Sequence, residues 1–436
     1  MLIHLKLDNF KIWKTTGPIR LAPVTLLLGT NSSGKSSLIQ SLLLIRQTVK
    51  GDDPSLDLNF GDPEAGDSVT LGRFTDVVTH RVYGNQIGIE FRWSKTGEAT
   101  DSAIFSAHYS QGRDGLAVLA DLHLGRGRQG FTVKRYKENA YRLWVADQSR
   151  MRGQSEDFRP QRSFAFSVAA LDRLERDGIQ IDNVGPQLLD ELGRIIYLGP
   201  VRRLAQRDYV WSGRMPTTIG DDGSKAVDAL IASGVAGKLA TKKRRPRPPE
   251  ARLIDETAAW LNRMDLADNL SVKQLGSSTR YELLVTRQGE TSNIKDVGVG
   301  VSQVLPVIVA ALHAPPGHIV IVEEPESHLH PLAESLLAEL FATVSKERGV
   351  QFIIETHSEH LFRRMQTLFA KQQVLKSDCA MYFVEREGNE AKLRELEAND
   401  YGAVANWPPN FFGDSLAETR EQARLMFERQ KLERQK

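Results

Sequence analysis

The chain has one cysteine, Cys379, among its 436 residues. A single thiol excludes an intramolecular disulfide and a cysteine-based zinc cluster, and it suits a reducing compartment. Long apolar runs are also scarce: the longest, residues 304–312, is short and contains Pro306. A membrane-spanning helix needs about 20 apolar residues. We therefore expect a cytoplasmic protein with no membrane segment.

An excess of charge of one sign is missing too, because 57 Lys and Arg residues nearly balance 55 Asp and Glu residues and leave a formal net charge of +2. This balance does not by itself indicate a nucleic-acid binder, so DNA binding would depend on local basic segments. Residues 1–13 alternate apolar with polar side chains, including His4 and Lys6. That pattern predicts a strand and argues against a signal peptide.

The clearest motif is Gly-Thr-Asn-Ser-Ser-Gly-Lys-Ser at residues 29–36. It matches the phosphate-binding loop G-x-x-x-x-G-K-[ST], and its flanks predict a buried strand over 24–28 and a helix over 36–46. The glycines let backbone N–H groups and the helix N-terminus converge on phosphates, Lys35 reaches the β- and γ-phosphates, and Ser36 offers a hydroxyl to Mg²⁺. The predicted nucleotide-binding residues are Gly29, Thr30, Asn31, Ser32, Ser33, Gly34, Lys35, Ser36 and Ser37.

The segments around this loop predict an α/β chain. Strands are expected over 2–10 and 19–28, followed by a Gly-, Asp- and Pro-rich loop over 51–72. A run of probable strands then indicates an antiparallel meander with a scaffolding role, over 86–93, 103–109, 116–124, 131–136 and 141–146. Residues 164–193 have a helical pattern and 194–199 return to a strand.

Carboxylates end the apolar run at 319–322, where Glu323 and Glu324 follow four apolar residues. In a parallel sheet the carboxyl ends of the strands face the ligand crevice, so both side chains should reach the phosphates held by Lys35. We expect Glu323 to hold Mg²⁺ opposite Ser36. Glu324 is expected to orient or deprotonate the water that attacks the γ-phosphate.

A histidine ends the next apolar strand, predicted over 351–356, and His357 is therefore expected at the same edge, where it can sense the γ-phosphate. His328, His330 and His360 lie nearby in sequence and invite a zinc interpretation. We favour Mg²⁺ alone, because two of these histidines are only two residues apart and no thiolate cluster accompanies them.

A second anion site is predicted at residues 293–303, just before an apolar helix over 304–312. Gly298 and Gly300 would expose backbone amides there, and Ser302 and Gln303 would place polar groups at the helix N-terminus. One nucleotide needs only one phosphate-binding helix end. The second is explained if it serves the nucleotide of another subunit, which predicts a homodimer or a higher homo-oligomer.

Two basic segments have open roles. Arg202, Arg203 and Arg207 follow a predicted strand end and could contact phosphates or form a solvated surface. The second segment could contact DNA, form a solvated linker or dock a partner. It contains Lys242, Lys243, Arg244, Arg245 and Arg247.

Taken in order, these motifs resemble those of the ABC-type ATPases of the SMC, RecF and OLD (overcoming lysogenization defect) group. The matching segments are an N-terminal strand at 7–12, the Walker A motif at 29–36, the signature at 296–303, the Walker B pair at Glu323 and Glu324, the D-loop at 325–331 and the switch histidine at His357. The resemblance implies ATP and Mg²⁺, with Lys35, Glu324 and His357 as catalytic residues. The signature departs from Leu-Ser-Gly-Gly-Gln, Glu323 replaces the usual Asp, and no Q-loop glutamine can be placed.

The resemblance also implies the architecture: an α/β, ABC/SMC-like P-loop ATPase core, with an antiparallel β meander and a helical lobe inserted between Walker A and the signature. We expect the N-terminal part of the core over 1–100, the inserted elements over 101–265, the C-terminal part of the core over 266–385 and a tail over 386–436. Residues 406–414 resemble a C-terminal region of unknown function in this group, including relatives associated with phage defence.

Two further absences narrow the function. After His357 there is no Asp-x-Asp pair in a βα unit, so we expect no Toprim nuclease, and no long heptad stretch supplies the coiled-coil arms of SMC proteins. We expect an ATPase that regulates a separately encoded effector, first of all a nuclease of an anti-phage defence system. The alternative is a RecF-like repair ATPase that binds DNA directly. A transporter ATPase or a non-hydrolysing scaffold fits less well.

The aromatic residues of the tail have two possible roles. They could form a docking surface for the effector or pack on the protein's own core. These residues are Tyr401, Trp407, Phe411 and Phe412.

Overall fold

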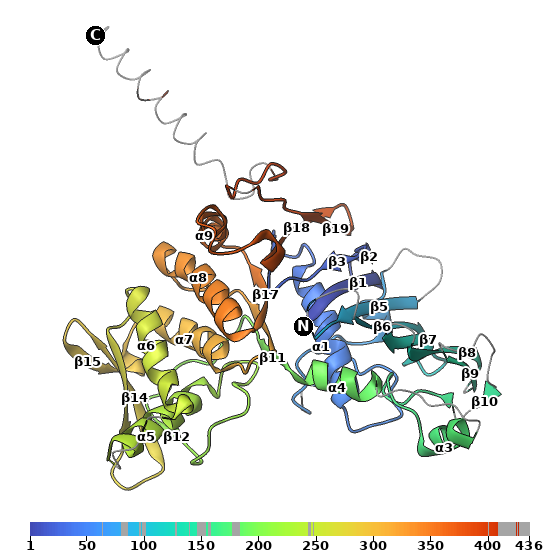
Figure 1. The fold of residues 1–436 in the computed structure, drawn as a ribbon, viewed down its shortest axis with the longest axis horizontal. Coiled ribbons are helices and arrows are strands. Elements are labelled where there is room, and N and C mark those ends of the chain that lie inside the picture. The colour runs from blue at the N-terminus through green and yellow to red at the C-terminus, as the bar shows by residue number, and fades with distance from the viewer. Residues whose placement is uncertain are drawn as a thin grey trace.

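The computed structural model describes residues 1–62, 64–79, 86–95, 97, 102–126, 129–138, 140–145, 154–155, 158–176, 184–242, 246, 248–399, 401–408, 424 and 426. Within these residues the chain forms three β-sheets with helices packed against them (Figure 1). No described helix is both long and apolar enough to cross a membrane.

The central sheet has six strands, and it carries the phosphate-binding loop. In spatial order they are β11 (Ile195–Leu198), β16 (Ile319–Glu323), β17 (Gln351–Thr356), β4 (Val24–Gly29), β18 (Cys379–Glu387) and β19 (Glu390–Glu395). The first five run parallel, and β19 pairs antiparallel with β18. Every residue of β4, β16 and β17 is buried, which explains why these strands are rich in apolar residues without a polar alternation.

A nine-stranded antiparallel sheet lies beside the central sheet (Figure 1). Its strands are β10 (Gln154–Ser155), β9 (Ala140–Val145), β8 (Gln129–Lys137), β7 (Ala117–Arg126), β6 (Ala103–Gln111), β5 (Gln86–Trp93), β1 (Leu2–Phe10) and β2 (Trp13–Thr15), with β3 (Ile19–Arg20) paired to β1. Buried and half-buried residues alternate along β6, so one face of the sheet packs on the core. The expected antiparallel meander is therefore confirmed.

The single strand predicted over residues 19–28 is wrong. Residues 19–28 form two strands, β3 in the antiparallel sheet and β4 in the central sheet, with a break at 21–23. Pro23 supplies no backbone N–H for a ladder, and the chain uses this break to pass from one sheet to the other. The two sheets are thereby joined directly at the start of the phosphate-binding strand.

A third sheet was not anticipated from the sequence. Its strands are β12 (Tyr209–Val210), β14 (Arg280–Arg287), β13 (Asn269–Gln274) and β15 (Glu290–Asn293). Many residues of its strands are polar and exposed. Helices α5 (Ala226–Lys242) and α6 (Leu253–Arg263) pack on this sheet. The remaining helices are α1 (Lys35–Lys50), α2 (Phe74–Val77), α3 (Val168–Arg176), α4 (Val184–Gly193), α7 (Val299–His313), α8 (Pro331–Arg348) and α9 (Glu359–Ala370), with 3₁₀ turns at Pro249–Arg252, Ile294–Asp296 and Lys376–Asp378.

The central sheet separates two hydrophobic cores. Alternate residues of β4 point to opposite sides: Leu26 and Leu28 join a core with α7, α8 and α9, whereas Leu27 joins a core with α1 and the antiparallel sheet. Helices α1 and α7 therefore cover opposite faces of the central sheet (Figure 1).

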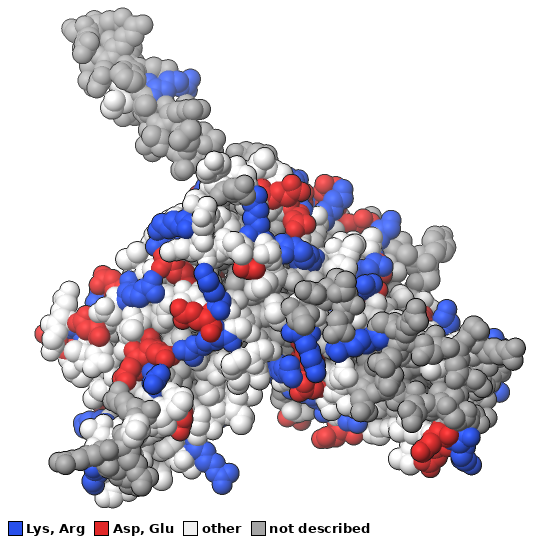
Figure 2. All heavy atoms as spheres, in the orientation of Figure 1, with Lys and Arg blue, Asp and Glu red and all other residues white. Residues whose placement is uncertain are grey.

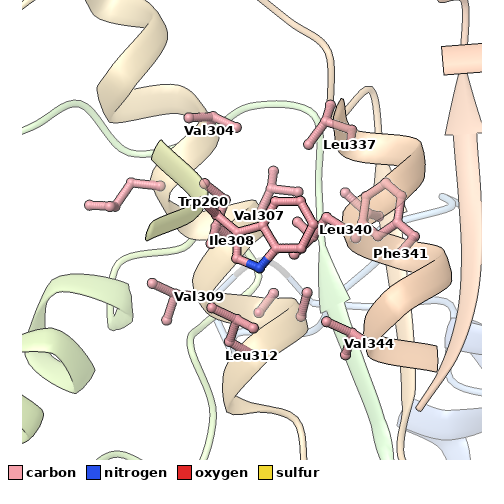
Figure 3. Packing of buried hydrophobic residues seen from close by; sticks show 14 of the residues in the cluster. Trp260, Val304, Val307, Ile308, Val309, Leu312, Leu337, Leu340, Phe341 and Val344 are labelled. Carbon is pink, nitrogen blue, oxygen red and sulfur yellow. The ribbon is translucent and has the colours of Figure 1, made fainter. Parts of the chain in front are cut away.

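The lobe that contains the third sheet is fixed to the central core by an aromatic anchor. Trp260 of α6 lies against Val307 and Ile308 of α7 and near Phe341 of α8, as Figure 3 shows. Only 8% of its surface is exposed. Burial of a side chain of this size makes a large contribution to packing, so the lobe and the signature helix are held as one unit.

Gln351 joins the antiparallel sheet to the central sheet. Its side chain is fully buried; Nε2 donates hydrogen bonds to the carbonyl oxygens of Leu2 (2.6 Å) and Ala22 (3.0 Å), and Oε1 accepts one from the Leu2 N–H (2.9 Å). One side chain thus satisfies backbone groups of both segments. An apolar side chain of similar size could not replace these bonds.

We therefore predict that Gln351→Leu lowers the free energy of unfolding by about 2–5 kcal/mol, because it leaves buried backbone groups without partners. The measurement is the denaturant midpoint at neutral pH. Gln373→Leu, at an exposed position, is the matched control and should change stability by less than about 0.5 kcal/mol. Equal midpoints for the two variants would contradict the role of Gln351.

Candidate active site

The predicted order of strand, loop and helix is present around residues 29–36, with β4 before the loop and α1 after it. Helix α1 begins at Lys35, one residue earlier than predicted, and extends to Lys50. Two loop positions require glycine. A Cβ on Gly29 would lie 2.2 Å from the Val384 carbonyl oxygen, and Gly34 has φ +113°.

The loop is held from outside by a residue that sequence reasoning missed. Trp13 is fully buried, and its Nε1 donates a hydrogen bond to the Gly34 carbonyl oxygen at 3.1 Å. Ser32 in the loop adopts a left-handed conformation with φ +58°. These constraints hold the backbone in a tight turn at the start of α1, where N–H groups can face an anion.

Lys35 is turned back onto its own loop. Its Nζ donates hydrogen bonds to the carbonyl oxygens of Gly29 (3.1 Å) and Thr30 (2.8 Å), and it lies 3.7 Å from Glu355 Oε1. The side chain is only 2% exposed. Burial lowers the pKa of Lys35, and the negative Glu355 opposes that shift.

The strand order brings a carboxylate to the loop that the sequence analysis did not single out. Because β17 lies between β4 and β16, its carboxyl end stands next to both, and Ser36 Oγ donates a hydrogen bond to Glu355 Oε1 at 2.9 Å. Glu323 and Glu355 are direct partners in the β16–β17 register. Glu355 follows three apolar residues near the end of β17, as Glu323 follows four at the end of β16, and that shared pattern could have identified it.

Glu323 is 7% exposed, and a tyrosine from β11 holds it in place. Tyr197 donates a hydrogen bond from its hydroxyl to Glu323 Oε1 at 2.8 Å. Burial raises the pKa of Glu323, whereas this hydrogen bond acts in the opposite direction. The predicted metal ligands Ser36 and Glu323 therefore both border Glu355.

Glu324 lies in a strained turn directly after β16. Its φ is +45°, a left-handed conformation that costs a non-glycine residue of the order of 1 kcal/mol or more. Its N–H donates to the Glu355 carbonyl oxygen at 2.8 Å, and Arg202 donates to the carbonyl oxygens of Glu323 (2.7 Å) and Glu324 (2.8 Å). A backbone bond to β17 and two bonds from the Arg202 side chain hold the turn in this conformation.

Arg202 therefore has a different role from either one considered for the arginine segment. It is 5% exposed, and burial lowers its pKa to about 10. The solvated-surface interpretation is wrong for Arg202, which supports the Walker B turn. Arg203 is exposed, and Arg207 pairs through two hydrogen bonds with Asp296, at 3.0 and 2.6 Å, in the signature segment.

His357 follows β17 at the same edge. Its backbone N–H donates to Glu326 Oε1 at 2.6 Å, and its ring is half-buried. Burial lowers the pKa of His357, the positive Lys35 lowers it further, and Glu324 acts in the opposite direction. The ring is therefore neutral at pH 7 and lies within the electrostatic reach of both other predicted catalytic residues.

The signature residues lie on the other face of the central sheet. Helix α7 begins at Val299 and not at 304, so Gly298 is its N-cap, and Gly300, Ser302 and Gln303 lie within its first turns. Ser302 Oγ donates to the Val299 carbonyl oxygen at 2.9 Å, while Gln303 is buried at 6% exposed. The helix N-terminus therefore lies five residues earlier than predicted, at Gly298 and Val299, and Ser302 and the buried Gln303 lie inside the helix.

The other predicted positions are exposed or lie outside the described residues. His328, His330 and His360 are exposed. Lys242 is exposed at the end of α5, whereas Lys243, Arg244, Arg245 and Arg247 lie outside the described residues. On the face shown in Figure 2, basic and acidic side chains are interspersed without a large patch of one sign.

Of the tail aromatics, Trp407 has the core-packing role considered for it, and Tyr401 is exposed. Trp407 stacks on Phe362 of α9, with ring centroids 4.4 Å apart, so it packs on the protein's own core. Tyr401 is 84% exposed. Phe411 and Phe412 lie outside the described residues.

We predict that the stability of the fold depends on pH through Glu355. Burial, and then the neighbouring Glu323, raise the pKa of Glu355 from 4.5 to about 7. Between these two pH values the folded protein keeps a proton on Glu355 that the unfolded chain releases. The stabilising contribution of Glu355 to the free energy of unfolding is therefore complete below about pH 4.5 and is lost as pH rises through about 7. The free energy of unfolding should lose about 3 kcal/mol from this group across that window.

Glu355→Gln should flatten this part of the pH profile, measured by denaturant unfolding without nucleotide or divalent ions. Glu347→Gln, at an exposed position on α8, should leave the profile as in the original chain. If the original chain and Glu355→Gln gave the same slope between about pH 4.5 and 7, the raised pKa would not belong to Glu355.

The solved structures with a distant similarity to the chain include three SMC head domains. One is titled as an SmcHead bound to the C-winged helix domain of ScpA (13% identity, 91% of this chain and 97% of that chain covered, TM-score 0.48). The others are an SMC head domain from Thermotoga maritima (13%, 91% and 99%, TM-score 0.42) and an Smc head domain with an extended coiled coil bound to the C-terminal domain of ScpA, derived from Pyrococcus furiosus (14%, 91% and 96%, TM-score 0.43). No curated protein matches the chain.

Comparisons with protein families give two matches. Residues 375–422 match a family described as "Protein of unknown function (DUF3696)", in agreement with the expected resemblance of the tail. Residues 24–363, which include the phosphate-binding loop, Glu323, Glu324 and His357, match a second family model. That match spans most of the sequence. The chain therefore belongs to the ATPase family described as "AAA domain, putative AbiEii toxin, Type IV TA system".

Proposed function

We propose that the chain binds ATP with Mg²⁺ at the carboxyl edge of the central sheet and hydrolyses it to ADP and phosphate. The observation that carries this proposal is the convergence of three strand ends: the loop after β4, Glu323 and Glu324 after β16, and Glu355 to His357 after β17. Ligands of open α/β sheets bind outside the carboxyl ends of their strands.

The residues present fit a magnesium ion. Ser36 Oγ and two buried carboxylates offer oxygen atoms, and Glu355 Oε2 is buried without a hydrogen-bond partner among the described residues. Mg²⁺ in phosphate sites takes one or two carboxylates together with phosphate oxygens. When bound, the ion would neutralise charge on the β- and γ-phosphates.

The roles of the chain's own residues follow from their positions. Lys35 leaves the loop carbonyls and pairs with the phosphates, and the backbone N–H groups at the start of α1 hold the β-phosphate. Glu324 orients a water molecule toward the γ-phosphate and accepts its proton as the new P–O bond forms and the bond to ADP breaks. Neutral His357 donates a hydrogen bond to the γ-phosphate.

We expect Lys35→Ala to lose ATP binding, whereas Glu324→Gln should keep binding but hydrolyse ATP about 100-fold to 10,000-fold more slowly, because a general base is lost. Equilibrium binding and steady-state phosphate release measure the two effects. Glu347→Gln is the control and should behave like the original chain. Normal turnover by Glu324→Gln would show that the water-orienting carboxylate is another residue.

We further propose that two copies of the chain close around two ATP molecules. The supporting observation is that the phosphate-binding helix α1 and the signature helix α7 pack on opposite faces of the central sheet. A Cβ added to Gly298 at the α7 N-cap would meet no other atom within 4 Å, and Ser302 is partly exposed. The N-terminus of α7 would contact the γ-phosphate of the nucleotide held by the other copy.

With ATP in the Glu324→Gln background, the mass measured by light scattering should therefore shift toward the dimer. Ser302→Arg should block the shift without abolishing ATP binding. Thr367→Arg is the control, because Thr367 also donates its hydroxyl to a carbonyl of its own helix, at 3.0 Å, but lies on α9. An ATP-dependent shift that persisted in Ser302→Arg would exclude the α7 N-terminus from the contact.

We propose that ATP turnover opens and closes the chain's dimer and that this movement regulates a separately encoded effector. The proposed effector is a nuclease in a bacterial anti-phage defence system. Among the described residues, no group of three or more His, Cys, Asp or Glu side chains could hold a metal ion for a second reaction. Exposed Tyr401 lies in the region matched to the family of unknown function, where a partner could dock.

The purified chain should accordingly hydrolyse ATP but leave DNA and RNA intact until the effector subunit is added. Incubation with plasmid, ATP and Mg²⁺ or Mn²⁺ tests this, with the Lys35→Ala chain as a control for contaminating nuclease. Cleavage that persists through every purification step and in Lys35→Ala would reveal a nuclease site in the chain itself.

A further inference from the structure

Glu355 is a buried carboxylate at the site with one oxygen that lacks a hydrogen-bond partner among the described residues. It is 4% exposed; Oε1 accepts the hydrogen bond from Ser36 Oγ, and Oε2 has no hydrogen-bond partner among the described residues. A buried carboxylate oxygen without a partner costs free energy, so an arrangement that keeps one points to a group that binds there.

A second carboxylate stands beside it. Glu323 is the register partner of Glu355 on the adjoining parallel strand, so both side chains point to the same face of the sheet. The Tyr197 hydroxyl donates a hydrogen bond to Glu323 Oε1, and the Ser36 hydroxyl donates one to Glu355 Oε1. Two buried groups of like charge beside one hydroxyl form an oxygen set suited to a hard cation.

Lys35 does not complete this set. Its Nζ is 3.7 Å from Glu355 Oε1, beyond hydrogen-bond distance, and it donates instead to the carbonyls of Gly29 and Thr30. When Lys35 turns toward nucleotide phosphates, Glu355 loses its nearest positive charge. The position beside Glu355 Oε2 is then free of protein cations that the structure places within ion-pair distance of this carboxylate among the described residues.

We propose that Glu355 is a direct ligand of the divalent ion that enters with ATP, together with Ser36 and Glu323. This inference rests on the proposed ATP site and deepens it, because it assigns the ion a ligand from β17 as well as from β16. The two carboxylates and the hydroxyl would supply oxygen ligands to the ion, and phosphate oxygens and water would supply the others.

The test separates metal binding from nucleotide binding. The affinity for the non-hydrolysable analogue AMP-PNP is measured by calorimetry with Mn²⁺ and again with EDTA, and the ratio of the two dissociation constants reports the contribution of the ion. Glu355→Gln should reduce this ratio about 10-fold or more. Its affinity in EDTA should stay the same or increase, which also shows that the variant is folded.

Glu334→Gln is the matched control, because Glu334 is a nearby carboxylate that accepts a hydrogen bond from Ser358 Oγ and not from Ser36. It should keep the original ratio. An unchanged ratio in Glu355→Gln would overturn the proposal, whether or not its affinity in EDTA improved. If the original chain bound no AMP-PNP under either condition, the proposed ATP site itself would fail.

A second variant covers the case in which Glu355→Gln does not fold. Glu355→Cys places a thiolate ligand at the same position. The natural cysteine, Cys379, is buried in the core and pairs with Val24, at the end of β4 away from the phosphate-binding loop. The preference for Cd²⁺ over Mg²⁺ in supporting AMP-PNP binding should rise at least about 10-fold, because soft thiolates favour soft ions. The same preference as in the original chain would contradict direct ligation.

Discussion

The position of β17 between β4 and β16 is the constraint on which the site depends. Parallel pairing of these three strands brings their carboxyl ends to one edge, so that residues far apart in the sequence meet around the phosphate-binding loop. Strand β11 stands beside β16 and supplies Tyr197, with Arg202 just after it. A different order would place Glu355 away from Ser36 and leave Glu323 without its neighbouring carboxylate.

Electrostatics then link ligand binding to the stability of the fold. Glu323 and Glu355 are buried beside each other, which is unfavourable for two negative charges. Lys35 donates its hydrogen bonds to carbonyl oxygens of the loop and not to these carboxylates. A nucleotide with a divalent ion would supply positive charge to the carboxylates and negative charge to Lys35. Binding would therefore stabilise the folded chain, as any ligand selective for the native state does.

The sequence identified the parts of the site that are contiguous motifs. The phosphate-binding loop, the Glu323–Glu324 pair and His357 each carry a local pattern at a strand end, and the structure brings them to one edge. Glu355, Tyr197 and Arg202 were missed or misassigned, because their roles depend on strand order and long-range packing that one sequence does not reveal.

The fold divides in the same way. The buried parallel strands and the antiparallel meander follow from their apolar patterns, whereas the sheet of β12 to β15 was missed because its strands carry many exposed polar residues. The crossing between sheets at residues 21–23 depends on which neighbours each half of the segment pairs with. Local propensity does not contain that information.

The central claim is that one edge of the central sheet holds ATP and its divalent ion together. The most direct measurement is a crystal structure of the Glu324→Gln chain with ATP and Mg²⁺. The account predicts phosphates on the loop before α1 and Mg²⁺ within about 2.1 Å of Ser36 Oγ and of carboxylate oxygens of Glu323 and Glu355. A nucleotide bound elsewhere, or Mg²⁺ placed away from β16 and β17, would contradict it.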